Sequence, residues 1–90
     1  MRIARRFVIR GRVQGVGFRY FTQDAARREG LHGFVRNNDD GTVEAVAEGE
    51  SEALERFERA IRRGPSRSRV GQVMTDEIAP NAATPGFEIR

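Results

Sequence analysis

The feature that most constrains this chain is a glycine-rich segment, Gly11 to Arg19, that joins two different sequence patterns. Before the segment, residues alternate with the period of two that is typical of a β-strand. After it, they recur at three- and four-residue steps, as on one face of a helix. The strand pattern is Phe7, Ile9 and Gly11 alternating with Val8 and Arg10, and the helical stripe is Phe18, Phe21, Thr22 and Ala25. These patterns predict a strand, a turn and a helix in direct succession.

The composition of this turn suits the binding of an anion. Gly15 and Gly17 let the backbone turn sharply and leave no side chain to keep a ligand away. Free N–H groups at the start of a helix, together with the positive end of the helix dipole, attract negative charge. Arg19 stands where the turn becomes a helix, and its guanidinium group can bind two phosphate oxygens at once. We interpret the segment as a phosphate-binding loop.

The spacing of these glycines does not match the two familiar phosphate-binding fingerprints. The dinucleotide pattern Gly-x-Gly-x-x-Gly would need a glycine at Tyr20, and the nucleotide P-loop would need Lys-Ser or Lys-Thr after its last glycine. Dinucleotide and nucleoside triphosphate binding are therefore not supported. On the loop alone, a plain structural turn stays open as an alternative to anion binding.

Length and composition limit the possible classes of protein. A chain of 90 residues predicts one domain, residues 1–90. The absence of cysteine excludes disulfides, thiolate nucleophiles and cysteine metal sites. The first residues, Met1 to Arg6, lack the apolar run of a signal peptide, and no later segment is apolar enough to span a bilayer. We expect a cytoplasmic protein, monomeric and without membrane contact.

The charge pattern raises the question of nucleic-acid binding. The formal net charge is +3, and all 16 basic residues are arginine. The pairs Arg5-Arg6, Arg27-Arg28 and Arg62-Arg63 could form a nucleic-acid patch. More often such arginines form a solvated face, and acidic residues are interspersed here. We therefore predict no nucleic-acid partner.

The remaining elements follow from local signals. Gly30 suits the residue just after a helix end, where a left-handed conformation is needed. Asn38 to Gly41 has the composition of a tight hairpin turn. Ser51 is predicted as the N-cap of a second helix, which Gly64-Pro65 ends. The expected strands are residues 5–13, 31–37, 42–49, 70–78 and 87–89. The expected helices are residues 18–29 and the stretch between Ser51 and Gly64, and a loop is expected at residues 80–86.

This order is β-α-β-β-α-β with a short additional strand. It predicts the α+β class and the ferredoxin-like split βαβ arrangement, with two helices on one face of an antiparallel sheet. The first two strands are joined by a helix, so they should run parallel and end at the same edge of the sheet. We therefore expect the glycine loop and Asn37-Asn38 to be neighbours in space, although about twenty residues separate them.

Two motifs together resemble the acylphosphatase family. Gly11 to Arg19 is similar to that family's phosphate loop, and Gly33-Phe34-Val35-Arg36-Asn37 is similar to its second motif, with Phe34 where tryptophan is usual. Further matching segments are Asp40-Gly41-Thr42-Val43, Gly64-Pro65, Arg69-Val70 and Phe87-Glu88-Ile89, so that the resemblance covers nearly the whole chain in order. A second departure is Glu29, which stands where an apolar residue is common.

The resemblance implies an enzyme that hydrolyses small acyl phosphates to a carboxylate and inorganic phosphate. It implies that the phosphoryl group is held by Arg19 and by the loop amides of Gln14, Gly15, Val16, Gly17 and Phe18. It also implies that Asn37 orients the attacking water and that neither a metal nor a cofactor takes part. Inorganic phosphate or sulfate is then expected to compete with the substrate.

Other residues that might carry chemistry are better explained structurally. His32, the only histidine, is predicted to be an ordinary residue at the start of a strand. Asp39 and Asp40 precede a glycine and are predicted to be turn residues. Ser51 has no basic partner in view and is interpreted as a cap and not as a nucleophile.

Two alternative functions stay open. RNA recognition motifs share the predicted topology, although a single phenylalanine at Phe34 does not make their aromatic platform. A domain of this kind could also lack free-standing activity and work only within a larger maturation enzyme.

Overall fold

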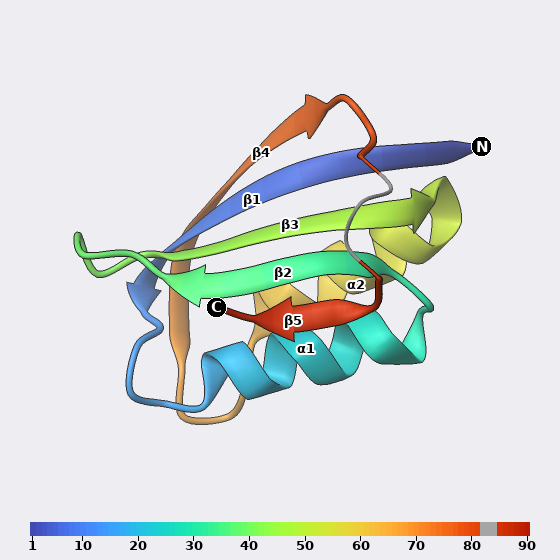
Figure 1. The fold of residues 1–90 in the computed structure, drawn as a ribbon. Coiled ribbons are helices and arrows are strands. Elements are labelled where there is room, and N and C mark those ends of the chain that lie inside the picture. Colours follow the sequence, from blue (N-terminus) through green and yellow to red (C-terminus); the bar gives the residue numbers. More distant parts are fainter. Residues whose placement is uncertain (82–84) are drawn as a thin grey trace.

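The computed structural model describes residues 1–81 and 85–90. Its elements follow the predicted order, and their bounds agree with the expected ones to within a few residues (Figure 1). They are β1 (Arg2–Arg12), α1 (Phe18–Arg28), β2 (His32–Asn37), β3 (Val43–Glu50), α2 (Ser51–Arg63), β4 (Arg69–Ile78) and β5 (Phe87–Ile89). The loop expected at residues 80–86 contains residues 82–84, which lie outside the described residues.

The strands form one sheet in the order β4-β1-β3-β2-β5. The pairs β1–β4, β1–β3 and β2–β3 are antiparallel, as expected for the split βαβ arrangement. The terminal strand β5 instead lies parallel to β2, with Gly33 opposite Phe87. The predicted α+β fold is confirmed. The sheet is mixed, because β5 pairs with β2 in parallel while the other three neighbouring pairs are antiparallel.

The crossover geometry brings the two sequence motifs to one end of the molecule. Both β1 and β2 are antiparallel to β3, which lies between them, so β1 and β2 are parallel to each other. Their carboxyl ends therefore lie at the same edge of the sheet. Figure 1 shows the loop after β1 and the turn after β2 at this same edge, on the left of the view.

The core lies between the sheet and the two helices, which cover one of its faces (Figure 1). Phe7 of β1 packs edge-on against Phe57 of α2, with ring centroids 5.6 Å apart. Phe57 also contacts Phe87 of β5, at 6.1 Å. Burying one such side chain contributes about 1.5–3 kcal/mol to stability. The largest fully buried side chains are Phe7, Phe18, Phe57, Ile9, Leu54, Ile61, Val13, Val35, Val43 and Thr22.

The ends of the helices agree only partly with the sequence prediction. Gly30 follows the end of α1 with a φ of 70°, as expected for a left-handed residue. Ser51 was predicted as the N-cap of α2, and this prediction is wrong. The cap position is Glu50, Ser51 is the first helical residue, and no side chain caps the helix. The Ser51 N–H instead donates to the Met1 carbonyl at 3.0 Å.

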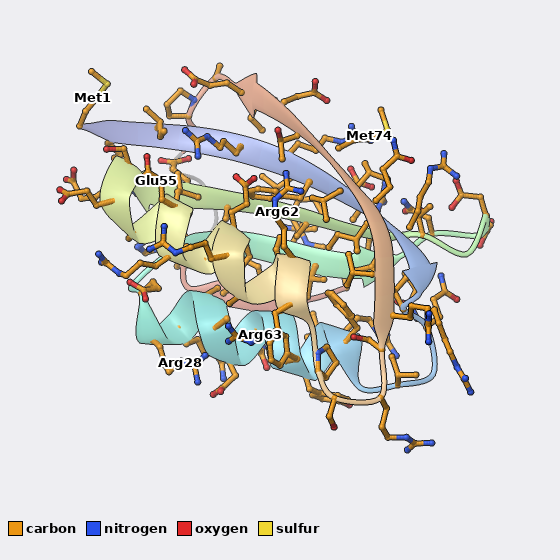
Figure 2. The ribbon with its side chains drawn as sticks, turned by 180° about the vertical axis from the view of Figure 1, so that it is seen from behind. Met1, Arg28, Glu55, Arg62, Arg63 and Met74 are labelled. Carbon is orange, nitrogen blue, oxygen red and sulfur yellow. The ribbon has the colours of Figure 1, made fainter. Side chains whose placement is uncertain are left out.

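The arginine pairs of the two helices, Arg27-Arg28 and Arg62-Arg63, are exposed on the surface. Figure 2 shows Arg28, Arg62 and Arg63 on the outer side of the two helices. Arg28 pairs with Asp24 at 3.3 Å and Arg62 with Glu58 at 2.9 Å, each one helical turn away. These ion pairs are typical of a solvated helix surface. Neither of the two helices in the described part of the chain is long and apolar enough to cross a membrane.

The open face of the sheet buries two carboxylates. Glu44 and Glu48 of β3 alternate with the core residues Val43, Ala45 and Ala47 and therefore point away from the helices, yet they are only 6% and 5% exposed. Glu44 accepts hydrogen bonds from the guanidinium groups of Arg6, at 2.7 Å, and Arg36, at 3.0 Å. Burial acts to raise the pKa of Glu44, but the hydrogen bonds from these two arginines outweigh it and hold the pKa below its ordinary value.

This arrangement predicts that the protein loses stability in acid. Because the folded-state pKa values of Glu44 and Glu48 are lowered, their stabilisation is complete above the unfolded value of about 4.3 and is lost as the pH falls through the folded-state values. The free energy of unfolding, measured in urea, should therefore decrease between about pH 5 and pH 3. Glu44→Gln should show a smaller decrease over this range. A wild-type free energy that stays constant from pH 5 to pH 3 would contradict the assignment.

Candidate active site

The loop between β1 and α1 owes its shape to two left-handed glycines. Gly15 has a φ of 74° and Gly17 a φ of 80°, in a region that other residues rarely adopt. A Cβ atom built on either glycine would meet no atom within 4 Å. The backbone dihedrals and not a lack of space therefore require glycine at these positions, and the predicted sharp turn is confirmed.

The loop and the first turn of α1 present a row of free N–H groups. The first intrahelical hydrogen bond runs from the Phe21 N–H to the Gly17 carbonyl, at 3.0 Å. In the described part of the chain, the N–H groups from Gly15 to Tyr20 have no acceptor, and no side chain caps α1. Unpaired N–H groups at the positive end of a helix form a binding site for an anion.

A small cavity of about 90 Å³ lies between the loop and the end of β2. Its lining residues are Val13, Gly15, Gly17, Phe18, Arg19, Tyr20 and Asn37. Val13 and Phe18 are each 1% exposed and belong to the hydrophobic core, which closes the inner side of the cavity. The expected proximity of the glycine loop and Asn37 is thus observed.

Two polar side chains at this cavity are half-buried and have no partner among the residues that the structure describes. The Arg19 guanidinium makes no ion pair, and the Asn37 carboxamide makes no hydrogen bond, with any described residue. Elsewhere in the same part of the chain, many of the arginines are paired with carboxylates. One cavity is thus surrounded by a free guanidinium, a free carboxamide and a row of free N–H groups. These groups are available to bind a ligand that carries a phosphate group.

Gln14 and Val16, two of the predicted loop residues, do not line the cavity. Val16 packs its side chain against the core. Gln14 donates from its side-chain nitrogen to the carbonyls of Asn38, at 2.8 Å, and Thr42, at 3.0 Å. Gln14 therefore ties the glycine loop to the turn that follows Asn37. This contact comes from the side-chain carboxamide and not from the glycine pattern, and no sequence motif around Gln14 indicates it.

The turn after Asn37 is held in one shape by its own side chains. Asn38 donates to the Thr42 hydroxyl at 3.0 Å. The Asp40 carboxylate accepts from both the Thr42 hydroxyl, at 2.7 Å, and the Thr42 N–H, at 3.0 Å. These hydrogen bonds from Thr42 lower the pKa of Asp40. Asp40 is thus a turn residue, as predicted, and the turn is a firm support for Gln14 and Asn37.

Comparisons with known proteins show which family the chain belongs to. The family model for acylphosphatase matches residues 5–89. This chain belongs to the acylphosphatase family. An acylphosphatase of Bacillus licheniformis is 53% identical over 72 residues, which are 80% of each chain. One from Pseudomonas paraeruginosa is 46% identical over 89 residues, 99% of this chain and 97% of that protein.

Solved structures in the acylphosphatase family share the fold. The crystal structure of an acylphosphatase from Bacillus subtilis matches with a TM-score of 0.94 and 41% identity, over 98% of each chain. A full-length HypF structure in a phosphate- and nucleotide-bound form contains a similar region. That match has a TM-score of 0.90 and 35% identity, and it covers all of this chain but only 12% of the other. The same domain thus occurs within a much longer protein.

The other candidate residues lie away from the cavity of this acylphosphatase fold. The Nδ1 atom of His32 accepts a hydrogen bond from the Gly86 N–H at 3.0 Å, at the start of β2 and so at the opposite end of that strand from Asn37. Ser51 begins α2 and lines no part of the cavity. Among residues 1–81 and 85–90, no three acidic or histidine side chains are grouped so as to hold a metal ion.

A larger cavity, of about 570 Å³, lies on the open face of the sheet, but its chemistry is different. It is lined by Phe34, Val46 and Ile78 among others, and it contains none of the predicted site residues. Its carboxylate, Glu48, is already bound by Arg2 at 3.0 Å and by the Asn81 N–H at 2.6 Å. The smaller cavity is therefore the candidate active site.

Proposed function

We propose that this chain is an acylphosphatase that hydrolyses the carboxyl–phosphate anhydride of small acyl phosphates. The observation that carries the proposal is that Arg19, Asn37 and the free loop amides surround one cavity. Water attacks phosphorus, the bond between phosphorus and the acyl oxygen breaks, and the products are a carboxylate and inorganic phosphate. The membership of the acylphosphatase family supports this reaction class.

The phosphoryl group is held by the loop. Of the predicted amides of residues 14–18, those of Gly15, Gly17 and Phe18 belong to residues that line the cavity, and the phosphoryl oxygens accept hydrogen bonds from them and from the Arg19 guanidinium, which neutralises their charge. A cavity of about 90 Å³ has room for a group of this size, since it equals about three water molecules' share of the liquid. Inorganic phosphate and sulfate present the same tetrahedral oxygens and should compete with the substrate.

Asn37 orients the attacking water. Its side-chain carbonyl accepts a hydrogen bond from the water and aims a lone pair of the water oxygen at phosphorus. No general acid is needed, because a carboxylate with a conjugate-acid pKa of about 4 is a good leaving group. The proton of the water passes to an oxygen of the substrate's own phosphoryl group. In a loose transition state, positioning and charge stabilisation supply most of the catalysis, and a metal ion is not required.

The alternative of RNA binding fits the open face of the sheet poorly. Phe34 lies on this face, but the guanidinium carbon of Arg90 lies 4.2 Å from its ring centre and covers it. On the helices, Arg28 and Arg62 are each paired with an acidic residue and are part of a solvated surface. We propose that the chain works as a cytoplasmic monomer on a small molecule, without nucleic acid or a membrane.

The direct test is an assay of the purified chain. Benzoyl phosphate should be hydrolysed equally well with and without EDTA, and inorganic phosphate should inhibit competitively. A phosphate monoester such as p-nitrophenyl phosphate, whose leaving group is poorer, should be hydrolysed far more slowly. Absence of benzoyl phosphate hydrolysis by the folded chain would refute the proposal and favour a domain that is active only within a larger protein.

Gln14 is predicted to be a positioning residue for this reaction. Gln14→Ala removes the hydrogen bonds to the carbonyls of Asn38 and Thr42, which should lower the free energy of unfolding by about 1–2 kcal/mol. The loop and the turn that carries Asn37 should then move relative to each other, and kcat/KM should fall about tenfold. Urea denaturation and benzoyl phosphate kinetics measure the two effects.

Gln23→Ala is the matched control, because the Gln23 side chain also donates to a backbone carbonyl, that of Phe87 at 3.1 Å, but lines no part of the cavity. It should lower stability with kcat/KM unchanged. If Gln14→Ala retained wild-type kcat/KM, the contact between loop and turn would have no part in catalysis.

A further inference from the structure

An exposed aromatic side chain lies at the rim of the candidate active site. Tyr20, in the first turn of α1, lines the cavity together with Arg19 and Asn37, and it is 68% exposed. No ring contact between Tyr20 and another aromatic side chain is found in the described part of the chain. The ring therefore has no aromatic partner among the described residues, and burial does not account for its position.

Tyr20 differs from the other exposed large hydrophobic residues in its position. Those among the described residues are Met1 and Met74, which are 87% and 50% exposed. Met1 is the chain terminus and Met74 lies on β4, and neither lines the cavity. Figure 2 shows them well apart from each other on the upper part of the molecule. Only Tyr20 combines exposed apolar surface with a place at the site.

The size of the cavity decides where the substrate's acyl group lies. This step depends on the proposed function, which places the phosphoryl group against the loop amides and Arg19. The cavity is small, at about 90 Å³, and the phosphoryl group takes up most of it. The loop backbone and the buried side chains of Val13 and Phe18 close the inner side. The acyl group must therefore extend outward across the rim.

The rim offers one apolar surface to that group. Arg19 and Asn37 present a charge and a carboxamide, whereas Tyr20 presents an aromatic ring. A tyrosine ring gives a flat contact area and has only two side-chain torsions to order, so it binds planar apolar groups at a small entropic cost. We propose that Tyr20 is the acyl-binding residue, and that it favours acyl phosphates with an aromatic or extended apolar acyl group over acetyl phosphate.

The test compares two substrates that share the phosphoryl group and differ only in the acyl group. For Tyr20→Ala, kcat/KM for benzoyl phosphate should fall about fivefold, mainly through KM, while kcat/KM for acetyl phosphate changes less than about twofold. Tyr20→Phe keeps the ring and should match the wild type on both substrates. Met74→Ala, which removes an exposed apolar side chain outside the cavity, should also leave the ratio of the two substrates unchanged.

The outcomes separate this inference from the proposed function. Inhibition by inorganic phosphate should be the same in Tyr20→Ala and the wild type, because the phosphoryl site is intact. An equal loss on both substrates, or no loss on benzoyl phosphate, would overturn the role of Tyr20 while leaving the acylphosphatase proposal in place. A wild-type chain that hydrolyses neither substrate would overturn both. Loss of benzoyl phosphate activity in Tyr20→Phe would assign the effect to the hydroxyl and overturn the ring contact.

Discussion

Arg19→Ala is expected to lower kcat/KM for benzoyl phosphate by about 10³-fold or more and to abolish competitive inhibition by inorganic phosphate. Arg19 is the one arginine that lines the cavity, and its guanidinium has no carboxylate partner among the described residues. Its charge is therefore fully available to the phosphoryl oxygens. A 10³-fold effect corresponds to about 4 kcal/mol of transition-state stabilisation, which is reasonable for a cation that contacts the transferred group.

The measurement needs variants that separate charge from position. Arg19→Lys keeps the charge but not the two-pronged geometry, and it should recover only part of the activity. Arg27→Ala removes the same charge from the last turn of the same helix, outside the cavity, and should leave kcat/KM unchanged. Circular dichroism should show all three variants folded, since Arg19 makes no ion pair with the described part of the chain. Strong phosphate inhibition of Arg19→Ala would exclude Arg19 from phosphoryl binding.

Asn37→Ala should lower kcat about 10²-fold and leave inhibition by inorganic phosphate nearly unchanged. Asn37 lines the cavity and its side chain makes no hydrogen bond with a described residue, so its truncation breaks no hydrogen bond within that part of the chain. Without its carbonyl, the attacking water loses its orientation, while the loop amides and Arg19 still hold the phosphoryl group. The expected pattern is therefore a large effect on kcat with a small effect on phosphate affinity.

Two comparisons make this result specific. Asp39→Ala alters an exposed residue in the neighbouring turn and should retain wild-type kcat. Asn37→Asp keeps the shape but introduces a negative charge beside the phosphoryl group, so it should weaken phosphate inhibition as well as kcat. Full activity in Asn37→Ala would mean that the water is oriented by another group.

The elements and their order follow from local sequence patterns. The alternation in β1 and the helical stripe of α1 are short-range properties, so each predicts its own element without knowledge of the rest. The rule that a helix between two strands makes them parallel then places Asn37 near the glycine loop, as observed. The two motifs that resemble the acylphosphatase family pointed to the same residues, and the family is confirmed.

Features that depend on distant contacts were not predictable in this way. Ser51 has the composition of an N-cap, but its N–H is taken by the carbonyl of Met1, which is fifty positions away and reaches it only through the sheet. Gln14 was predicted to contribute a loop amide, and its side chain proved to bind the carbonyls of Asn38 and Thr42. No pattern around Gln14 indicates where those two carbonyls lie.

The sequence by itself determined the order of the elements, the left-handed turn at Gly15 and Gly17 and the family, because each depends on residue type at short range or on motif identity. Only the tertiary structure decided which side chains at the site are free. Arg19 and Tyr20 belong to α1 and Asn37 to the end of β2, and whether each finds a partner depends on what the packed chain places beside it. Availability to a ligand is a property of that packing and cannot be read from any single segment.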